Sequence, residues 1–336
     1  MTTTQIILPP SPAGPLAPTL EQAQARTDAR QKAELLAQLA LAPKTRQAYT
    51  SDWREWCTWC MSVAYDPLPA QDEQLAQWAA GLAGRVSFST IGRRLAAVRT
   101  INRLAGYPAP DGPACRAVLQ GVRNQFGAAE RKAAPLTIDL LRLICDRLRP
   151  ESIRDVRDRC ALLLGWAGAL RRSELGALRW QDAREQEGGL LLFLAWSKGD
   201  KARQGVLVPI PAGVHPATDP VRALQAWRRM LRRTHRPTDG AQPLLRGLSR
   251  QGTLRGRMPD SSICSMVKAR IEQIGRDPKL YSGHSLRAGF ITTAAQLGFS
   301  LGVIAEQSRH LDMNVLREYV RLGTALQNSP AGKVGL

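Results

Sequence analysis

The sequence predicts a mainly helical protein (mainly α) with a small β-sheet, arranged in two domains. Apolar residues recur at steps of three and four along most of the chain, which is the periodicity of amphipathic helices. Strand-like apolar runs are confined to one short region, residues 189–211. The length of 336 residues exceeds one ordinary domain, so two domains are the default expectation.

The composition indicates a polyanionic partner and a reducing compartment. Forty-seven Lys and Arg against 28 Asp and Glu give a net charge of +19, which is spread along the chain. Six cysteines fall mostly inside apolar helical patterns, and we find neither a secretory signal peptide nor an apolar run that could span a bilayer. We therefore expect a cytoplasmic protein without membrane association.

The chain is expected to begin with a disordered segment, residues 1–35, and to continue as a helical domain over residues 36–128. The first residues are rich in proline and carry no charge, which favours disorder. The next segment carries the apolar stripe of an amphipathic helix, made of Tyr49, Trp53, Trp56, Cys60 and Val63. Further helices are predicted at residues 71–83, 89–105 and 114–126.

The CxxC formed by Cys57 and Cys60 is interpreted as core packing. No second cysteine or histidine pair follows at the spacing of a zinc site, so we assign no metal to it.

The helix over residues 89–105 has one apolar side and one basic side. The basic side carries Arg93, Arg99 and Arg103 among small residues, which lets a helix approach phosphates or enter a major groove. A solvated face is the alternative interpretation. We also assign Thr90 of this helix, and Lys268 of the second domain, to DNA contacts.

A linker is predicted over residues 129–136, where small and charged residues end at a proline. The second domain, residues 137–336, begins with a capped helix, followed by a buried helix and a break near Gly168. Arg171 emerges at this break, three residues before Glu174, whose carboxylate is placed to hold it. Two strands follow, joined by a hairpin turn that carries Lys198 and Lys201.

The last part of the chain carries the remaining candidates. His284 and Arg287 share a face in the first turn of a helix, where free N–H groups and the helix dipole favour an anion. His310 and Tyr319 follow, nine positions apart. Each of these signals is weak evidence for a functional site when taken alone. Their occurrence together in this order strengthens that evidence.

Four segments, in this order, resemble the motifs of the tyrosine recombinases, the phage integrase family. GALRRSEL resembles their first box, SKGDK their lysine-bearing β-turn, SGHSLRAG their second box and RHLDMNVLREYV their histidine-to-tyrosine segment. The resemblance covers about residues 40–330. NRLAGYPAP, YSGHSLRAG and the YVR at residues 319–321 are similar in particular to Cre-type recombinases.

The resemblance implies a role for each matching residue. Tyr319 is the nucleophile, Arg171 and Arg287 clamp the phosphate, Lys198 is the general acid, His284 is the base or proton shuttle, and His310 falls where the family has His or Trp. The sequence departs from the family pattern in two places. Arg172 follows Arg171 and is an alternative first arginine, and Ser308-Arg309 replaces the commoner Leu-Gly before the histidine.

The resemblance also implies the architecture and the partners. A helical core-binding domain of the SAM-like type and an α+β catalytic domain would close around double-stranded DNA as a C-shaped clamp. The enzyme would cleave and rejoin DNA through a 3′-phosphotyrosine, with no cofactor, metal or ATP. We expect a nucleoid-associated monomer in free solution that forms a homo-tetramer on two inverted-repeat sites, with its C-terminal tail docked on a neighbour.

Two other functions share these features: a DNA-binding accessory protein that keeps the fold without the chemistry, and a type IB topoisomerase. A complete catalytic set favours the recombinase over the accessory protein. The sequence does not identify the DNA target, the need for accessory factors, the outcome of the reaction, or an origin in a phage, plasmid, transposon or chromosome.

Overall fold

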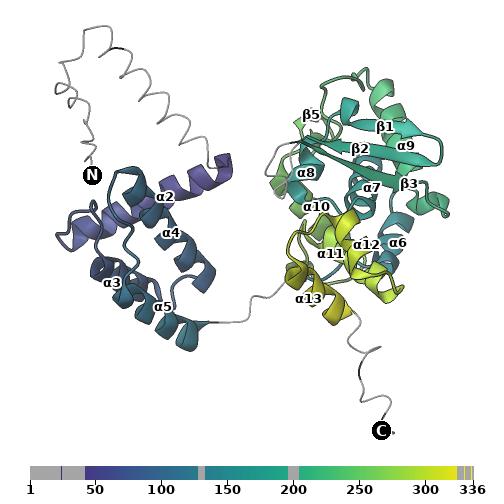
Figure 1. The fold of residues 1–336 in the computed structure, drawn as a ribbon. Helices are drawn as coiled ribbons and strands as arrows, with labels where there is room; N and C mark the ends of the chain where they lie inside the picture. Colours follow the sequence, from purple (N-terminus) through teal and green to yellow (C-terminus); the bar gives the residue numbers. More distant parts are fainter. Residues whose placement is uncertain are drawn as a thin grey trace, which may run out of the picture. The chain divides into compact units, whose positions relative to one another are not determined.

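The computed structural model describes residues 42–127, 133–195 and 204–323, together with the single residues 24, 329 and 334. The chain forms two compact units, Met1–Glu130 and Arg131–Leu336 (Figure 1). The segment 1–35, predicted to be disordered, lies outside the described residues except for residue 24. Over the described part of the chain, no helix has the length and apolar character needed to cross a membrane.

Over residues 42–127, the first unit has four helices around one apolar core. The helices are α2 (Pro43–Ser62), α3 (Asp72–Leu82), α4 (Phe88–Leu104) and α5 (Pro113–Phe126). Trp56 and Trp78 meet edge to face in the core, with ring centroids 5.2 Å apart. The carboxylate of Asp72 accepts hydrogen bonds from the backbone N–H groups of Gly112 and Ala114, so the start of α3 holds the start of α5.

Cys57 and Cys60 belong to this core. Cys60 is fully buried, and burial followed by the neighbouring Cys57 raises the pKa of its thiol to about 11. Within residues 42–127 and the other described ranges, no three His, Cys, Asp or Glu side chains are grouped to hold a metal ion.

The second unit is a helical body with two small antiparallel sheets. Its helices are α6 (Ile138–Asp146), α7 (Ile153–Ala167), α8 (Arg172–Ala177), η1 (Trp180–Asp182), η2 (Pro216–Thr218), α9 (Pro220–Arg233), α10 (Asp260–Gln273), η3 (Pro278–Leu280), α11 (Ser285–Gln296), α12 (Leu301–Ser308) and α13 (Met313–Gly323). Its strands are β1 (Ala183–Gln186), β2 (Gly189–Leu194), β3 (Val206–Pro211), β4 (Arg246–Leu248) and β5 (Leu254–Arg257). The first sheet has the order β1-β2-β3, and β4 pairs with β5.

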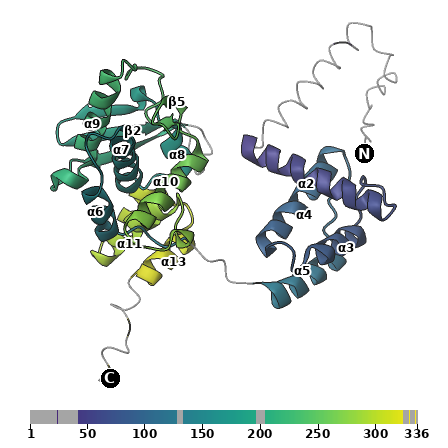
Figure 2. The same ribbon diagram turned by 180° about the vertical axis from the view of Figure 1, so that it is seen from behind.

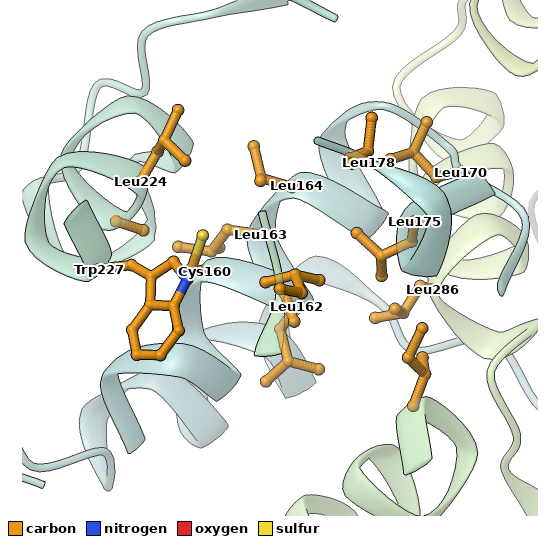
Figure 3. Close-up of a cluster of buried hydrophobic side chains, with 14 of the residues drawn as sticks. Cys160, Leu162, Leu163, Leu164, Leu170, Leu175, Leu178, Leu224, Trp227 and Leu286 are labelled. Atoms are coloured by element: carbon orange, nitrogen blue, oxygen red, sulfur yellow. The ribbon is translucent and has the colours of Figure 1, made fainter. Parts of the chain in front are cut away.

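Helix α7 is the central element of the second unit and packs against both α9 and α11 (Figure 2). Its buried leucines meet Trp227 of α9 on one side and Leu286 of α11 on the other (Figure 3). A Cβ atom at Gly165 would lie 2.8 Å from Leu286 Cδ1 and 3.0 Å from Leu175 Cδ2. Glycine at this position therefore lets α7, α8 and α11 approach closely, which fixes where the end of α7 lies.

The sequence predicted a linker over residues 129–136 and a second domain that starts at residue 137. In the structure, the second unit begins before that residue. The backbone N–H of Ala134 donates to Leu280 O at 2.8 Å, and that of Leu136 donates to Ser285 O at 2.9 Å. Leu136 is fully buried, and its carbonyl lies where a Cβ on Gly289 would be. These hydrogen bonds and this burial make residues 134–136 part of the folded unit.

Candidate active site

The carboxyl end of α7 gathers cationic side chains from later in the chain. The last carbonyls of a helix lack partners within it, and the helix dipole makes this end negative. Arg287 Nη1 donates to Ala169 O at 2.8 Å, and Arg309 donates to Gly168 O at 3.0 Å and to Ala169 O at 3.1 Å. Gln307 Nε2 donates to the carbonyl of the last helical residue at 3.0 Å. The break after α7 therefore places two guanidinium groups side by side.

Arg171 is held at the same place by a buried carboxylate. Glu174 Oε2 accepts from the backbone N–H of Arg171 at 2.8 Å, and Oε1 accepts from its guanidinium at 2.6 Å. Arg309 Nη2 donates to Glu174 Oε2 at 3.1 Å. Burial acts to raise the pKa of Glu174, but the hydrogen bonds and charges of the two arginines lower it overall. Glu174 is therefore ionised and orients both guanidinium groups.

The side chain of Arg172 lies elsewhere. A Cβ atom on Gly283 would meet Arg172 Cδ at 3.1 Å, so the stem of this arginine packs over Gly283. In this arrangement Arg171, and not Arg172, is paired with the buried carboxylate of Glu174.

His310 connects Arg287 to Tyr319. Arg287, on α11, is 6% exposed, and its Nη2 lies 3.2 Å from His310 Nδ1 and 3.3 Å from Nε2. The rings of His310 and Tyr319 have centroids 6.4 Å apart, tilted by 46°. Tyr319 lies on α13 and packs on a small core that includes Ile304 and is built from α11, α12 and α13. Three helices thus bring an arginine, an imidazole and a phenol together.

The hydrogen bonds of His310 define the state of its ring. The hydroxyl of Ser308 donates its one hydrogen to Ile304 O at 2.5 Å, so it accepts from His310 Nδ1 at 2.8 Å. Nε2 is then the nitrogen that accepts from Arg287. Burial, followed by the charges of Arg287, Arg171 and Arg309, lowers the pKa of His310 to about 4. The imidazole is therefore neutral at pH 7.

The cluster has a strong positive potential. Three guanidinium groups, from Arg171, Arg287 and Arg309, gather around one buried carboxylate, Glu174, which is ion-paired with Arg171 and Arg309. Burial, followed by the charges of Arg171 and Arg309, lowers the pKa of Arg287 to about 9, so this guanidinium still carries its charge at neutral pH. A site of this kind attracts an anion and resists losing it to solvent.

The two other predicted catalytic residues are His284 and Lys198. His284 lies at the start of α11 with an exposed side chain, and its backbone N–H donates to Ser282 Oγ at 3.1 Å. Lys198, with Lys201, lies outside the described residues, in the connection between β2 and β3.

The predicted DNA-binding residues of α4 differ among themselves. Arg93 is ion-paired with Asp52, and Arg99 is ion-paired with Asp111 at 2.9 Å with its side chain 20% exposed. Arg99 therefore lies against the loop before α5. Arg103 is exposed.

The last two predicted DNA contacts have different surroundings. Thr90 is half-buried and shares a hydrogen bond with Ser87 Oγ at 2.9 Å. Lys268 of α10 is exposed. A DNA contact by Thr90, Arg93, Arg99, Arg103 or Lys268 stays a prediction.

Arg309 is the site residue that sequence reasoning missed. It was treated only as a departure from the family pattern, with no role. The available signal was an arginine next to the histidine, at a position where the family commonly has glycine.

This site combines a tyrosine, a neutral imidazole and clustered arginines. Such a combination is typical of an enzyme that attacks a phosphodiester. Comparison with known proteins agrees. The model of the phage integrase family matches residues 136–325, which is more than half of the chain. The protein belongs to this family, the tyrosine recombinases, and is a DNA strand cleavage and ligation enzyme of the site-specific recombinase type.

Individual relatives support the same family. An integrase/recombinase XerD homologue from Selenomonas ruminantium is 31% identical over 313 residues, covering 90% of this chain and 89% of the relative. A tyrosine recombinase from Synechococcus elongatus is 28% identical over 290 residues, covering 83% of this chain and 84% of the relative.

Solved structures show the fold. XerH site-specific recombinase bound to a palindromic difH substrate has a TM-score of 0.57 at 18% identity, covering 79% of this chain and 72% of that one. A lambda integrase dimer bound to a COC′ core site has a TM-score of 0.57 at 15% identity, and the match covers 88% of this chain and 94% of that one. The predicted fold class, mainly α with small sheets, is confirmed.

Proposed function

We propose that this recombinase cleaves and rejoins duplex DNA at a specific site through a 3′-phosphotyrosine intermediate. The observation that carries the proposal is the contact between Arg287, His310 and Tyr319, beside Arg171 held by Glu174. A phosphodiester in this cluster would meet a nucleophile on one side and fixed positive charge around its oxygens.

Cleavage exchanges one phosphate ester for another. The phenolic oxygen of Tyr319 attacks phosphorus, the new bond joins the 3′ strand to the tyrosine, and the bond to the 5′-oxygen breaks. We assign the proton that the leaving 5′-oxygen needs to Lys198, and the tyrosine proton to His284. A 5′-hydroxyl then attacks the phosphotyrosine in the reverse step, so ligation needs no ATP.

The two arginines supply the charge stabilisation. Negative charge grows on the non-bridging oxygens in the transition state, and preorganised bidentate donors aimed at these oxygens lower the barrier. Arg171 is held by the carboxylate of Glu174, and Arg287 by the carbonyl of Ala169 just after α7, before substrate binds. Because this charge comes from side chains, we expect cleavage to persist in EDTA.

His310 supports Arg287 without adding charge of its own. Its Nδ1–H is used by Ser308, so Nε2 presents a lone pair to Arg287. A neutral ring in this position orients the guanidinium and leaves the charge available for the phosphate.

Assembly on DNA is the finer part of the proposal. We propose a monomer in free solution and a homo-tetramer on two inverted-repeat sites, with the two units closed on duplex DNA as a C-shaped clamp. An apolar cavity of about 1010 Å³ in the second unit supports the docking of a neighbour's C-terminal tail. Its lining includes Phe290, Leu297, Phe299 and Val303, three of which are more than half exposed: 72%, 54% and 52%.

The test is covalent capture. A duplex selected from a random pool by binding to the protein is incubated with wild type, Tyr319→Phe and Tyr281→Phe. We expect an adduct that survives boiling in SDS with wild type and Tyr281→Phe, and none with Tyr319→Phe. Tyr281 is the matched control because it is buried in the core of the second unit.

Two results would contradict the proposal. An adduct that persists in Tyr319→Phe would move the nucleophile to another residue. Relaxation of a supercoiled plasmid that lacks the selected duplex would indicate a topoisomerase and not a site-specific recombinase.

A further inference from the structure

Arg309 occupies a backbone position that usually belongs to glycine. It caps the carboxyl end of α12 with φ of 56° and ψ of 45°, in the left-handed region. Residues with a Cβ atom are strained there, and glycine is the common residue at such a helix end. An arginine in this place implies that contacts of its side chain offset the strain.

The two Nη groups of Arg309 are used by protein acceptors. Nη1 donates to Gly168 O at 3.0 Å and to Gln307 O at 2.8 Å. Nη2 donates to Ala169 O and to Glu174 Oε2, both at 3.1 Å. Each of the four Nη hydrogens therefore has one acceptor. The side chain is 9% exposed, and its Nε, which has no partner among the described residues, is buried away from solvent, so no accessible donor remains for a phosphate.

These contacts join three parts of the site. The acceptors lie in the break after α7, in α8 and at the end of α12, and the backbone carbonyl of Arg309 accepts from Arg171 Nη2 at 3.3 Å. The next residue is His310. One side chain thus links the carboxylate that orients Arg171 to the backbone that carries His310.

We propose that Arg309 is a positioning residue for DNA cleavage, which fixes Arg171 through Glu174 and fixes the backbone of His310. This inference rests on the proposed cleavage reaction. Arg171 is more open, with its side chain 20% exposed, and keeps the role of a phosphate-binding arginine that we propose for it. Arg309 differs from it because it acts only through its neighbours.

The electrostatic contribution of Arg309 provides a second readout. Its charge is among those that lower the pKa of His310, after burial and the charges of Arg287 and Arg171. Removing the guanidinium should therefore raise the pKa of His310 from about 4, and a lysine should preserve more of the lowering.

The experiment compares Arg309→Gly with Arg309→Lys. Glycine accepts the left-handed backbone, so this variant removes the guanidinium without adding strain. Lysine keeps the charge but lacks the planar fork of donors. The matched control is Arg142→Ala on α6, which removes an exposed arginine whose nearest carboxylate, Asp139, lies 3.6 Å away.

The measurement is single-turnover adduct formation on a nicked duplex of the selected sequence, at saturating protein and at a temperature where every variant is folded. We expect Arg309→Gly to be slower by about 10- to 100-fold, the range that small misplacement of catalytic groups produces, with a dissociation constant for DNA within about threefold of wild type. Arg309→Lys should fall between the two, and Arg142→Ala should match wild type.

A double-mutant cycle with Glu174→Gln tests whether Arg309 acts through Glu174. If Arg309 acts through Glu174, adding Arg309→Gly to Glu174→Gln should slow cleavage much less than it slows wild type. Fully additive losses would overturn the inference, as would a Gly variant that cleaves at the wild-type rate or loses only DNA affinity. If wild type itself forms no adduct on the duplex that it selects, the proposed cleavage reaction fails, irrespective of Arg309.

Discussion

The carboxylate of Glu174 accepts hydrogen bonds from both the backbone N–H and the guanidinium of Arg171. The buried carboxylate therefore fixes the start of α8 and the direction of the arginine together. Arg287 is fixed differently, by the carbonyl of Ala169 and by His310. Two guanidinium groups held by protein acceptors give a site that is organised before the phosphate arrives.

Loss of either arginine should stop cleavage while leaving the fold intact. We expect Arg171→Ala and Arg287→Ala each to slow adduct formation by at least about 10²- to 10³-fold, since one preorganised donor to a developing oxyanion contributes about 2.7–4 kcal/mol. Single-turnover cleavage of the selected duplex measures this. Arg172→Ala is the matched control, because its stem packs over Gly283. A severe Arg172→Ala with a harmless Arg171→Ala would reverse the assignment.

The neutral state of His310 predicts a dependence of stability on pH. In the unfolded chain histidine titrates near about 6.5, whereas the pKa of His310 in the folded protein is about 4. Between these values the unfolded chain binds more protons, so stability contributed by His310 falls as the pH drops from about 6.5 towards 4.

Thermal unfolding of wild type and His310→Phe, measured from pH 7 to pH 4.5, checks this expectation. The melting temperature of wild type should decrease more steeply below pH 6.5 than that of the variant. His215→Phe is the control, because His215 is an exposed histidine of the same unit. Parallel curves for wild type and His310→Phe would show that His310 is not the group that titrates.

Local patterns in the sequence predicted most of the helices and strands. The apolar periodicity located the helices, and the spacing of Arg171 and Glu174 predicted the ion pair that the structure shows. Contacts between distant segments were not predictable in this way. Leu136 appeared to be linker because its partners, Ser285 and Gly289, lie far along the chain. The role of Arg309 depends on carbonyls that only the fold brings near it.

The basic helix α4 shows the same limit and leads to a sharper prediction. A helical wheel gave Arg99 and Arg103 the same status, but Arg99 is paired with Asp111 and Arg103 is exposed. If this face meets DNA, Arg103→Gln should weaken binding and reduce the salt slope by about one for a single phosphate contact. Arg99→Gln should mainly lower the melting temperature.

The salt slope is obtained from dissociation constants measured between about 50 and 200 mM salt. Over this range, binding affinity that depends on phosphate contacts changes strongly. Arg116→Gln on α5, also exposed in the first unit, is the control for general loss of charge. Equal slopes for Arg103→Gln and wild type would make this face solvated surface.

The last prediction concerns the tail and the apolar cavity of the second unit. Residues 325–336 carry few apolar side chains, too few for a core of their own, and we propose that they dock on a neighbour. The cavity offers an apolar surface between α11 and α12 that reaches β3. Deleting residues 325–336 should leave binding to a single half-site nearly unchanged and should abolish cooperative binding and recombination.

A substitution inside the cavity should reproduce that defect from the acceptor side. Val303→Asp places a charge among apolar lining residues, where docking would have to desolvate it. Val303 is 52% exposed in the monomer, so the fold should tolerate the change. Gel-shift titrations on half-sites and full sites separate the two effects: affinity for one half-site should stay within about threefold of wild type, while cooperativity disappears. Normal recombination by the truncated protein would refute docking of the tail, and normal cooperativity in Val303→Asp would move the acceptor to another surface.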